Sequence, residues 1–283
     1  MSKSFKRNVL IVDGSHYLYR AYFGVPDSAR LPSGLQVNAV YGFFAYLRKT
    51  VGLLSPDLVF TVFDSETGIS DKTQVNSDYK ADRLNLDTGM YKQLPIIKKL
   101  LTLIDIPFIE PENHEADDYI SSLAMKYSKS SKVYIFSNDK DFLQVIGSNI
   151  SLVKIGKKTP ETINEESFIK DYGFECRQYL DYLSLKGDSS DNIPGIPGIG
   201  HKTAQSLVSQ YGDIDSIYQN LHLLSSRLCS MLSENKEIAY NNKKFLRIDM
   251  SVDIESSAIE LPNNSYSKLM LPTNSLLSQI GIK

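Results

Sequence analysis

The sequence predicts an α/β protein with a mostly parallel central sheet flanked by helices, followed by a helical lobe. Over the first two thirds, short uncharged segments of β-branched and aromatic residues alternate with longer stretches of helical periodicity. This alternation is typical of buried parallel strands joined by helices. After about residue 162 the strand-like segments disappear, so we expect a core over residues 1–162 and a helical lobe over residues 163–283.

The predicted elements follow from these patterns in chain order. Strands are expected at residues 9–12, 58–63, 107–109, 133–136 and 151–154. Helices are expected at residues 38–53, 91–103, 116–127, 140–145, 165–172, 178–184, 202–211 and 226–245. The polar stretch at about residues 66–92 interrupts the alternation, and a loop of that length in a compact domain is usually functional or disordered.

Composition narrows the class of protein. The chain has 283 residues, of which 42% are hydrophobic and 23% charged, which is ordinary for a globular protein with a full core. Two cysteines make neither a disulfide framework nor a zinc site, so a cytoplasmic protein is expected. No apolar run approaches the ~20 residues that span a bilayer, which excludes a membrane protein.

Acidic residues recur where the predicted strands end, which is where open parallel sheets place their sites. The set comprises Asp13, Asp64, Glu115, Asp117, Asp118, Asp139 and Asp141, with a further pair, Asp188 and Asp191, at the entry to the helical lobe. A single Asp after a strand is more often a helix cap than a ligand. Capping does not account for acids after nearly every strand, so we interpret the set as a metal site.

Clustered carboxylates repel one another unless cations neutralise them, and hard oxygen ligands select Mg²⁺, with Mn²⁺ as the alternative. Nine carboxylates can hold two ions. Two ions roughly 4 Å apart suit phosphodiester hydrolysis. The net charge is only −2, but bases outnumber acids once the nine are set aside, so a basic DNA track is compatible with the composition.

A glycine-rich segment at residues 195–204 carries the second signal. Its apolar residues alternate with glycines and a helix is expected to follow, which predicts a helix-hairpin-helix over about residues 187–211. Glycines let the backbone approach a phosphate, and helix N-terminal amides bind it. The spacing does not fit a nucleotide-binding P-loop. The expected DNA-binding residues are Gly195, Gly198, Gly200, His201, Lys202 and Thr203.

Taken together, these motifs resemble the 5′-nuclease domain of bacterial DNA polymerase I and, more distantly, the flap endonucleases. The matching segments begin at Val12, Tyr19, Asn38, Val62, Tyr79, Glu115, Asp139, Gly187 and Gly198, in the family's order over nearly the whole chain. The resemblance implies a PIN-like core. It also implies one metal bound by Asp13, Asp64, Glu115 and Asp117 with Asp118 close by, and a second served by Asp139, Asp141, Asp188 and Asp191.

The resemblance also implies a helical arch at about residues 66–92 that covers the site. Lys80 and Arg83 would contact the scissile phosphate as catalytic residues. Arg20, Tyr17, Tyr22 and Lys72 would be further substrate contacts, and the hairpin would grip duplex DNA with a bound K⁺. The chain departs from the family around the arch, with Asp71-Lys72 in place of Phe-Arg and residues 84–87 in place of a Pro-rich stretch.

The sequence therefore predicts a metal-dependent 5′-3′ exonuclease and 5′-flap endonuclease that acts in replication and repair. Its expected partner is DNA with 5′ ends or flaps, duplex plus single strand, and RNA primers are a further candidate substrate. A monomer is expected, with a DNA polymerase supplied by a separate chain. Two alternatives stay open: a catalytically silent protein that binds branched DNA, and a ribonuclease of the related PIN fold.

Overall fold

The computed structural model describes residues 7–65, 88–156, 159–254 and 266–282. A six-stranded sheet has the order β3-β2-β1-β4-β5-β6. Its strands are β1 (Asn8–Asp13), β2 (Leu58–Val62), β3 (Phe108–Ile109), β4 (Lys132–Phe136), β5 (Ile150–Ile155) and β6 (Pro160–Ile163). The first five run parallel and β6 pairs antiparallel with β5. The predicted α/β fold with a mostly parallel sheet is confirmed.

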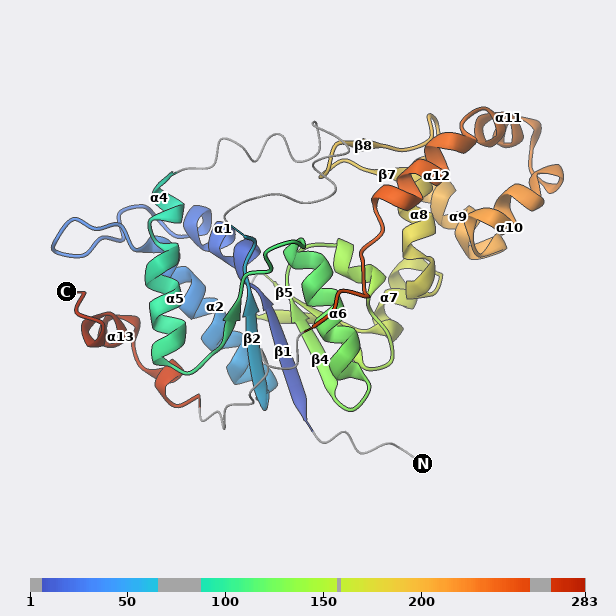
Figure 1. Ribbon diagram of the computed structural model, residues 1–283. Coiled ribbons are helices and arrows are strands. Elements are labelled where there is room, and N and C mark those ends of the chain that lie inside the picture. Colours follow the sequence, from blue (N-terminus) through green and yellow to red (C-terminus); the bar gives the residue numbers. More distant parts are fainter. Residues whose placement is uncertain (1–6, 66–87, 157–158, 255–265, 283) are drawn as a thin grey trace.

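Helices cover both faces of the sheet (Figure 1). In β1, Val9 and Ile11 join the apolar cluster that contains α6 (Ala116–Ser128), whereas Leu10 and Val12 join the opposite cluster. This division follows from the alternation of side chains along a strand. The opposite cluster contains residues of α1 (Gly14–Gly24), α2 (Asn38–Leu54), α4 (Thr88–Tyr91) and α5 (Leu94–Leu103). Both faces of β1 are therefore buried, which explains its uninterrupted apolar sequence.

The helical lobe extends beyond the sheet on the side of α6 (Figure 1). It is built from α7 (Glu165–Tyr172), η3 (Cys176–Gln178), α8 (Tyr179–Lys186), α9 (His201–Tyr211), α10 (Ile214–Gln219), η4 (Leu221–Leu223), α11 (Ser226–Glu234) and α12 (Lys236–Phe245). A short hairpin of β7 (Gly187–Asp188) and β8 (Ile193–Pro194) joins α8 to α9. The helix expected over residues 226–245 is two helices, because the chain breaks at Asn235 between them.

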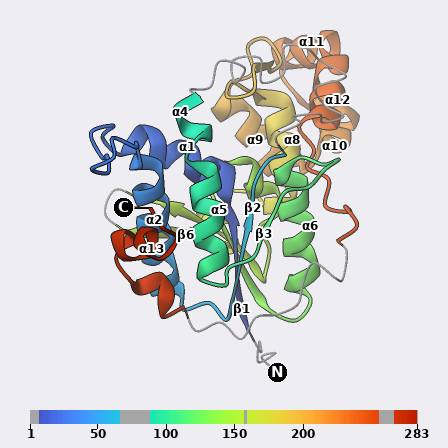
Figure 2. The ribbon, with the colours of Figure 1, turned by 60° about the vertical axis from the view of Figure 1, so that its left-hand side comes forward.

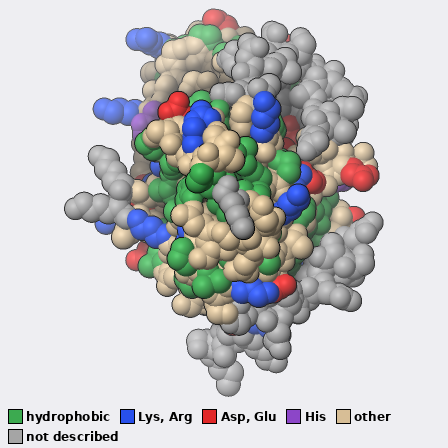
Figure 3. All heavy atoms as spheres, turned by 90° about the vertical axis from the view of Figure 1, so that its left-hand side faces the viewer, with side chains coloured by type: hydrophobic (Ala, Val, Ile, Leu, Met, Phe, Trp, Pro, Cys, Tyr) green, Lys and Arg blue, Asp and Glu red, His purple; other side chains and the backbone are tan. Residues whose placement is uncertain are grey.

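The end of the chain returns to the α/β core. After η6 (Lys268–Met270), α13 (Thr273–Gln279) lies beside α2 and α5 (Figures 1 and 2), where Leu269 and Leu276 are buried. Arg48 of α2 fastens this segment by donating to the Thr273 hydroxyl at 2.6 Å. Figure 3 shows apolar side chains gathered on the face where α13 lies. The end of the predicted helical lobe, residues 163–283, is therefore different: η6 and α13 pack with the α/β core.

Within the described ranges, no helix is long and apolar enough to cross a membrane.

Candidate active site

The sheet reverses its strand order between β1 and β4. From β1 the chain moves outward to β2 and β3 on one side, and β4 and β5 lie on the other side. Open α/β sheets place their ligands at such a switch point, beyond the carboxyl ends of the strands. Asp13 is the last residue of β1, and Ser137 directly follows β4. The first predicted carboxylate thus lies at the position that the topology favours for a site.

Asp13 is held rigidly at this edge. Its side chain is 4% exposed; one carboxylate oxygen accepts from the His16 amide at 3.0 Å and the other from the Ser137 hydroxyl at 2.7 Å. The first of these bonds caps α1. The next residue must be small, because a Cβ on Gly14 would lie 2.6 Å from the ring of Phe63. Sequence and packing together fix the direction of this carboxylate.

The electrostatics of Asp13 disfavour its charge in the absence of a cation. Burial raises its pKa to about 7, and the nearby carboxylates of Asp64 and Asp139 add to the rise. The hydrogen bonds from Ser137 and His16 act in the opposite direction. Asp64 and Asp139 therefore lie near enough to Asp13 to disfavour its charge, and a bound cation would stabilise the ionised form.

Two hydroxyl groups that sequence reasoning missed organise this edge. The Ser137 oxygen, which is fully buried, also accepts from the Asp139 amide at 3.0 Å, and the Asp139 carboxylate accepts from the Asp141 amide at 3.0 Å. The Ser15 oxygen accepts from the Asp64 amide at 2.8 Å. Ser137 therefore connects the end of β4 to Asp13, and Ser15 connects the end of β2 to the start of α1.

The acidic start of α6 lies after β3. Glu115 is the N-cap, in extended backbone conformation, directly before the helix predicted from residue 116, and Asp117 and Asp118 lie in the first turn. Negative charge is stabilised at a helix N-terminus. Asp118 is 9% exposed, and its carboxylate accepts from the Asp249 amide at 2.8 Å. One carboxylate oxygen of Asp118 thus already accepts a hydrogen bond from the backbone.

The last acidic pair lies in the hairpin between α8 and α9. Asp188 and Asp191 are each 8% exposed. The Asp188 carboxylate accepts from both the amide and the hydroxyl of Ser190, the amide at 2.8 Å. Burial of these two acids is unusual for charged side chains and suits ligands better than a solvated surface.

The donor set fits divalent cations in its chemistry. It consists of carboxylates, the hard oxygen ligands that Mg²⁺ and Mn²⁺ prefer. Among the residues that the structure describes, no three His, Cys, Asp or Glu side chains already stand as close together as the ligands of one ion. The fit to a divalent cation therefore rests on the chemistry of the donors.

Two aromatic residues of α1 that were expected to contact substrate, Tyr17 and Tyr22, are buried. Tyr17 is 1% exposed, stacks on Phe136 with ring centroids 3.8 Å apart, and donates to Asn138 at 3.2 Å. Tyr22 is 9% exposed. This burial argues against contact with DNA and assigns both rings to the interior, because DNA can stack only on an exposed ring face.

Two other rings of α1 face solvent. Tyr19 is 49% and Phe23 59% exposed, and their centroids lie 4.6 Å apart. Arg20, on the same helix, is half-buried. The four-residue spacing of Tyr19 and Phe23 places both on one helix face, a signal that the sequence already contained. Both rings are therefore open to contact from solvent.

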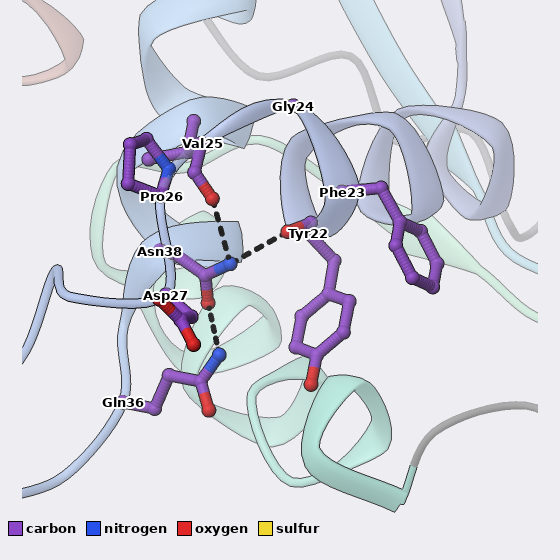
Figure 4. A pocket seen from close by; sticks show the side chains of 8 residues that line it. All are labelled: Tyr22, Phe23, Gly24, Val25, Pro26, Asp27, Gln36 and Asn38. Atoms are coloured by element: carbon purple, nitrogen blue, oxygen red, sulfur yellow. Dashed lines mark hydrogen bonds between the residues drawn. The ribbon is translucent and has the colours of Figure 1, made fainter.

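A cavity of about 520 Å³ opens at the end of α1 (Figure 4). Asn38 closes its wall by donating to the carbonyl oxygens of Tyr22 at 2.6 Å and Val25 at 3.1 Å. In Figure 4 the ring of Tyr22 points toward α4 and that of Phe23 points away from Asn38. Asn38 therefore has a structural role, since its amide fixes the turn that follows α1.

The predicted hairpin glycines differ in what surrounds them. A Cβ on Gly195 would lie 2.1 Å from the Lys186 carbonyl oxygen, and one on Gly198 would lie 2.2 Å from the Met231 side chain. Gly198 also has a φ of +82°, which disfavours other residues. Gly200 is exposed and has nothing within 4 Å of its Cβ position. The open glycine, at the N-cap of α9, is therefore Gly200.

Gly200→Val is expected to weaken duplex binding by about tenfold, the equivalent of one lost hydrogen bond to a charged group. Its φ of −94° and ψ of −172° admit valine, so only an approaching phosphate would meet the new side chain. Fluorescence anisotropy with a nicked duplex measures the effect. Gly147→Val, at another glycine with nothing within 4 Å of its Cβ position, is the control. Equal affinity of the two variants would contradict the assignment.

The residues after Gly200 begin α9. The His201 ring nitrogen Nδ1 lies 2.7 Å from the Tyr182 hydroxyl of α8, which ties the two helices of the motif together. His201 and Lys202 are exposed and Thr203 is half-buried. Lys202 places a positive charge at a helix N-terminus, where backbone amides can bind a phosphate.

Lys72, Lys80 and Arg83, and with them most of the expected arch at about residues 66–92, lie outside the described residues.

Comparison with known proteins supports the predicted family. Residues 8–173 match the family model "5′-3′ exonuclease, N-terminal resolvase-like domain", and residues 174–268 match "5′-3′ exonuclease, C-terminal SAM fold". A 5′-3′ exonuclease of Aquifex aeolicus is 32% identical over 280 residues, covering 97% of this chain and 95% of that protein. DNA polymerase I of Caldicellulosiruptor bescii is 30% identical over 286 residues, but the match spans only 33% of that longer chain.

Solved structures share the fold at low sequence identity. The bacteriophage T5 D15 flap endonuclease, solved with DNA and metal ions, superposes with a TM-score of 0.70 at 16% identity, covering 96% of this chain and 98% of that one. The catalytic core of Rad2 in complex with DNA substrate superposes with a TM-score of 0.62 at 16% identity, covering 96% and 92%. With two family models adjoining across residues 8–268, the chain belongs to the 5′-3′ exonuclease family.

Proposed function

We propose that this chain hydrolyses phosphodiester bonds of DNA as a 5′-3′ exonuclease and 5′-flap endonuclease, and that it removes flaps or RNA primers in replication and repair. The observation that carries the proposal is the carboxylate edge at the switch point of the sheet. There Asp13 is fixed by Ser137 and lies close enough to Asp64 and Asp139 for their charges to raise its pKa. Relatives named 5′-3′ exonuclease support it.

The residues divide into two groups that would each hold a Mg²⁺ or Mn²⁺ ion. Asp13, Asp64, Glu115 and Asp117, with Asp118 nearby, would form one group, and Asp139, Asp141, Asp188 and Asp191 the other. Divalent ions held by these carboxylates would supply an activated water molecule and charge stabilisation for the leaving oxygen. The chain's part is to hold the carboxylates in place, which the Ser137 and Ser15 hydrogen bonds do for the sheet edge.

DNA would lie across both halves of the molecule. The α9 N-terminus at Gly200, with His201, Lys202 and Thr203, would take a duplex phosphate, aided by a K⁺ ion bound at the hairpin. On α1, Arg20 would contact a phosphate, and the exposed pair Tyr19 and Phe23 would offer a stacking surface to a base. Lys72, Lys80 and Arg83 stay predicted contacts of the 5′ strand.

Two functions of other classes compete with this one. A silent protein that binds branched DNA would bind flaps without cutting them. A ribonuclease of the PIN fold would cut RNA and spare DNA. The complete set of nine carboxylates favours an enzyme over the silent binder, and the helix-hairpin-helix favours DNA over a small ribonuclease target.

Purified protein is expected to cut a 5′-flap DNA in Mg²⁺ and to lose all cleavage in excess chelator. Labelled flap, nicked duplex and single-stranded substrates, each with a DNA or an RNA 5′ strand, separate the three functions on a sequencing gel, and product lengths separate mononucleotides from whole flaps. Asp171→Asn, which removes an exposed acid of α7 distant in sequence from the site, is the control. Tight binding of the flap DNA without cleavage in any divalent metal would refute the proposal that this chain is a nuclease.

We propose that the chain acts as a monomer and that its substrates arise beside a DNA polymerase. The DNA polymerase I relatives, which match over about a third of their length, support the link to a polymerase.

A further inference from the structure

Residues 246–254, here named the strap, run from the end of α12 along α6 (Figure 1). Leu246, Ile248, Val252 and Ile254 are buried, and the residues between them include exposed Arg247 and Asp249. This alternation has the period of a β-strand. The strap nevertheless joins neither of the two sheets that the structure describes, so its backbone groups must bond elsewhere.

Side chains of α6 satisfy those backbone groups at regular intervals. The Asp118 carboxylate accepts from the Asp249 amide at 2.8 Å. The Ser122 hydroxyl donates to the Asp249 carbonyl at 3.3 Å and accepts from the Val252 amide at 3.0 Å. Lys126 donates to the Ile254 carbonyl at 3.0 Å. Residues 118, 122 and 126 are four apart, so they line one face of the helix.

The strap begins where α12 of the helical lobe ends. At that point Gln144 of η2 (Asp141–Gln144), in the α/β core, donates to the Leu246 carbonyl at 2.9 Å. Within α12, Asn242 donates to the Pro194 carbonyl of the hairpin at 2.8 Å and to the Ser184 carbonyl of α8 at 3.2 Å. The strap thus joins the hairpin side of the lobe to the helix whose first turn is acidic.

We propose that Asp118 and Ser122 are positioning residues, which lock α6 against the strap so that Glu115 and Asp117 stay at the carboxylate edge. This inference rests on the proposed function, since it concerns the same metal site. Carboxylates at the edge repel the acidic first turn of α6, and like charges in low dielectric repel strongly. The strap opposes that displacement. Asp118 therefore serves the site through the Asp249 amide, in addition to its charge.

The chain offers a matched pair of substitutions for the test. Ser122→Ala removes both strap bonds of one hydroxyl. Ser121→Ala makes the same chemical change one residue earlier, at a fully buried hydroxyl that has no hydrogen-bond partner. Mn²⁺ is titrated calorimetrically into each DNA-free protein, and hydrogen exchange is measured at the Asp249 and Val252 amides. Ser122→Ala is expected to raise the Mn²⁺ dissociation constant by about tenfold and to speed exchange, because supporting bonds tune metal affinity by that order.

The outcomes separate the inference from the proposed function. Faster exchange of the strap amides with Mn²⁺ affinity equal to that of Ser121→Ala would overturn the positioning role, as would unchanged exchange. A second pair, Asp118→Asn against Asp118→Ala, tests the hydrogen bond, because asparagine keeps an acceptor for the Asp249 amide. Affinity that falls less in Asp118→Asn supports positioning, and equal loss in both overturns it. If the unaltered protein does not cleave DNA, the proposed nuclease function is refuted, whereas the metal-binding results still decide the positioning role.

Discussion

Asp13→Asn is expected to lower the single-turnover rate of flap cleavage by roughly 1,000-fold, the scale on which one preorganised group stabilises a transition state. Asparagine has nearly the same shape, and it caps helices as well as aspartate does, so the bond from the His16 amide can persist. What disappears is the negative charge at the centre of the carboxylate edge. Rapid mixing of excess enzyme with labelled flap DNA measures the rate.

The affinity for flap DNA should change little in the same variant, because duplex contacts are expected at the hairpin of the helical lobe. Asp171→Asn serves again as the control, since it removes an exposed carboxylate from α7. A rate within tenfold of the unaltered protein would show that Asp13 is a structural cap and that the metal assignment is mistaken.

Ser137→Ala is expected to lower the cleavage rate by roughly 10- to 100-fold, the usual effect of losing a group that orients a ligand. The hydroxyl donates to Asp13 at 2.7 Å and accepts from the Asp139 amide at 3.0 Å, so it supports both proposed metal groups. Without it Asp13 can rotate, and the part-buried Asp139 amide loses its acceptor. The rate should recover partly as Mg²⁺ is raised, because mass action compensates for weaker binding.

Ser137→Thr separates this effect from simple destabilisation. Threonine keeps the hydroxyl and adds a methyl group to a fully buried position, so it should cost stability but retain most of the rate. Thermal unfolding is measured beside cleavage for both variants. If threonine and alanine lose rate equally, packing rather than the hydrogen bond explains the effect.

The sheet was predictable because its central strands are buried on both faces and therefore carry an unbroken apolar signal. Residues 165–172 were predicted with their observed bounds, since a capping box at Asn164 and a glycine at 173 mark both ends. β6 was missed because it is a short edge strand that begins with proline. The strap was missed although it alternates in the manner of a strand, because its partner is a helix.

The candidate site was predictable in its acids but not in their supports. The nine acids follow predicted strands or lie in the hairpin. The alternation of strands and helices in the sequence is enough to locate such positions. That Ser137 bonds Asp13 could not be inferred, since the two are 124 residues apart and meet only through the pairing of β1 with β4. Likewise Tyr17 and Tyr19 look equivalent in sequence, and only the rotation of α1 against the sheet decides which ring is buried.

The helical lobe is tethered to the core at both ends. It leaves the core after β6 and returns through the strap, which is hydrogen-bonded to α6 of the core. With a single connection the lobe could rotate relative to the core about that point. Two separated attachments prevent most of that rotation. The span between Gly200, the proposed duplex contact, and the carboxylates around Asp13 would therefore stay constant. The distance from duplex junction to cut bond should be the same for flaps of every length.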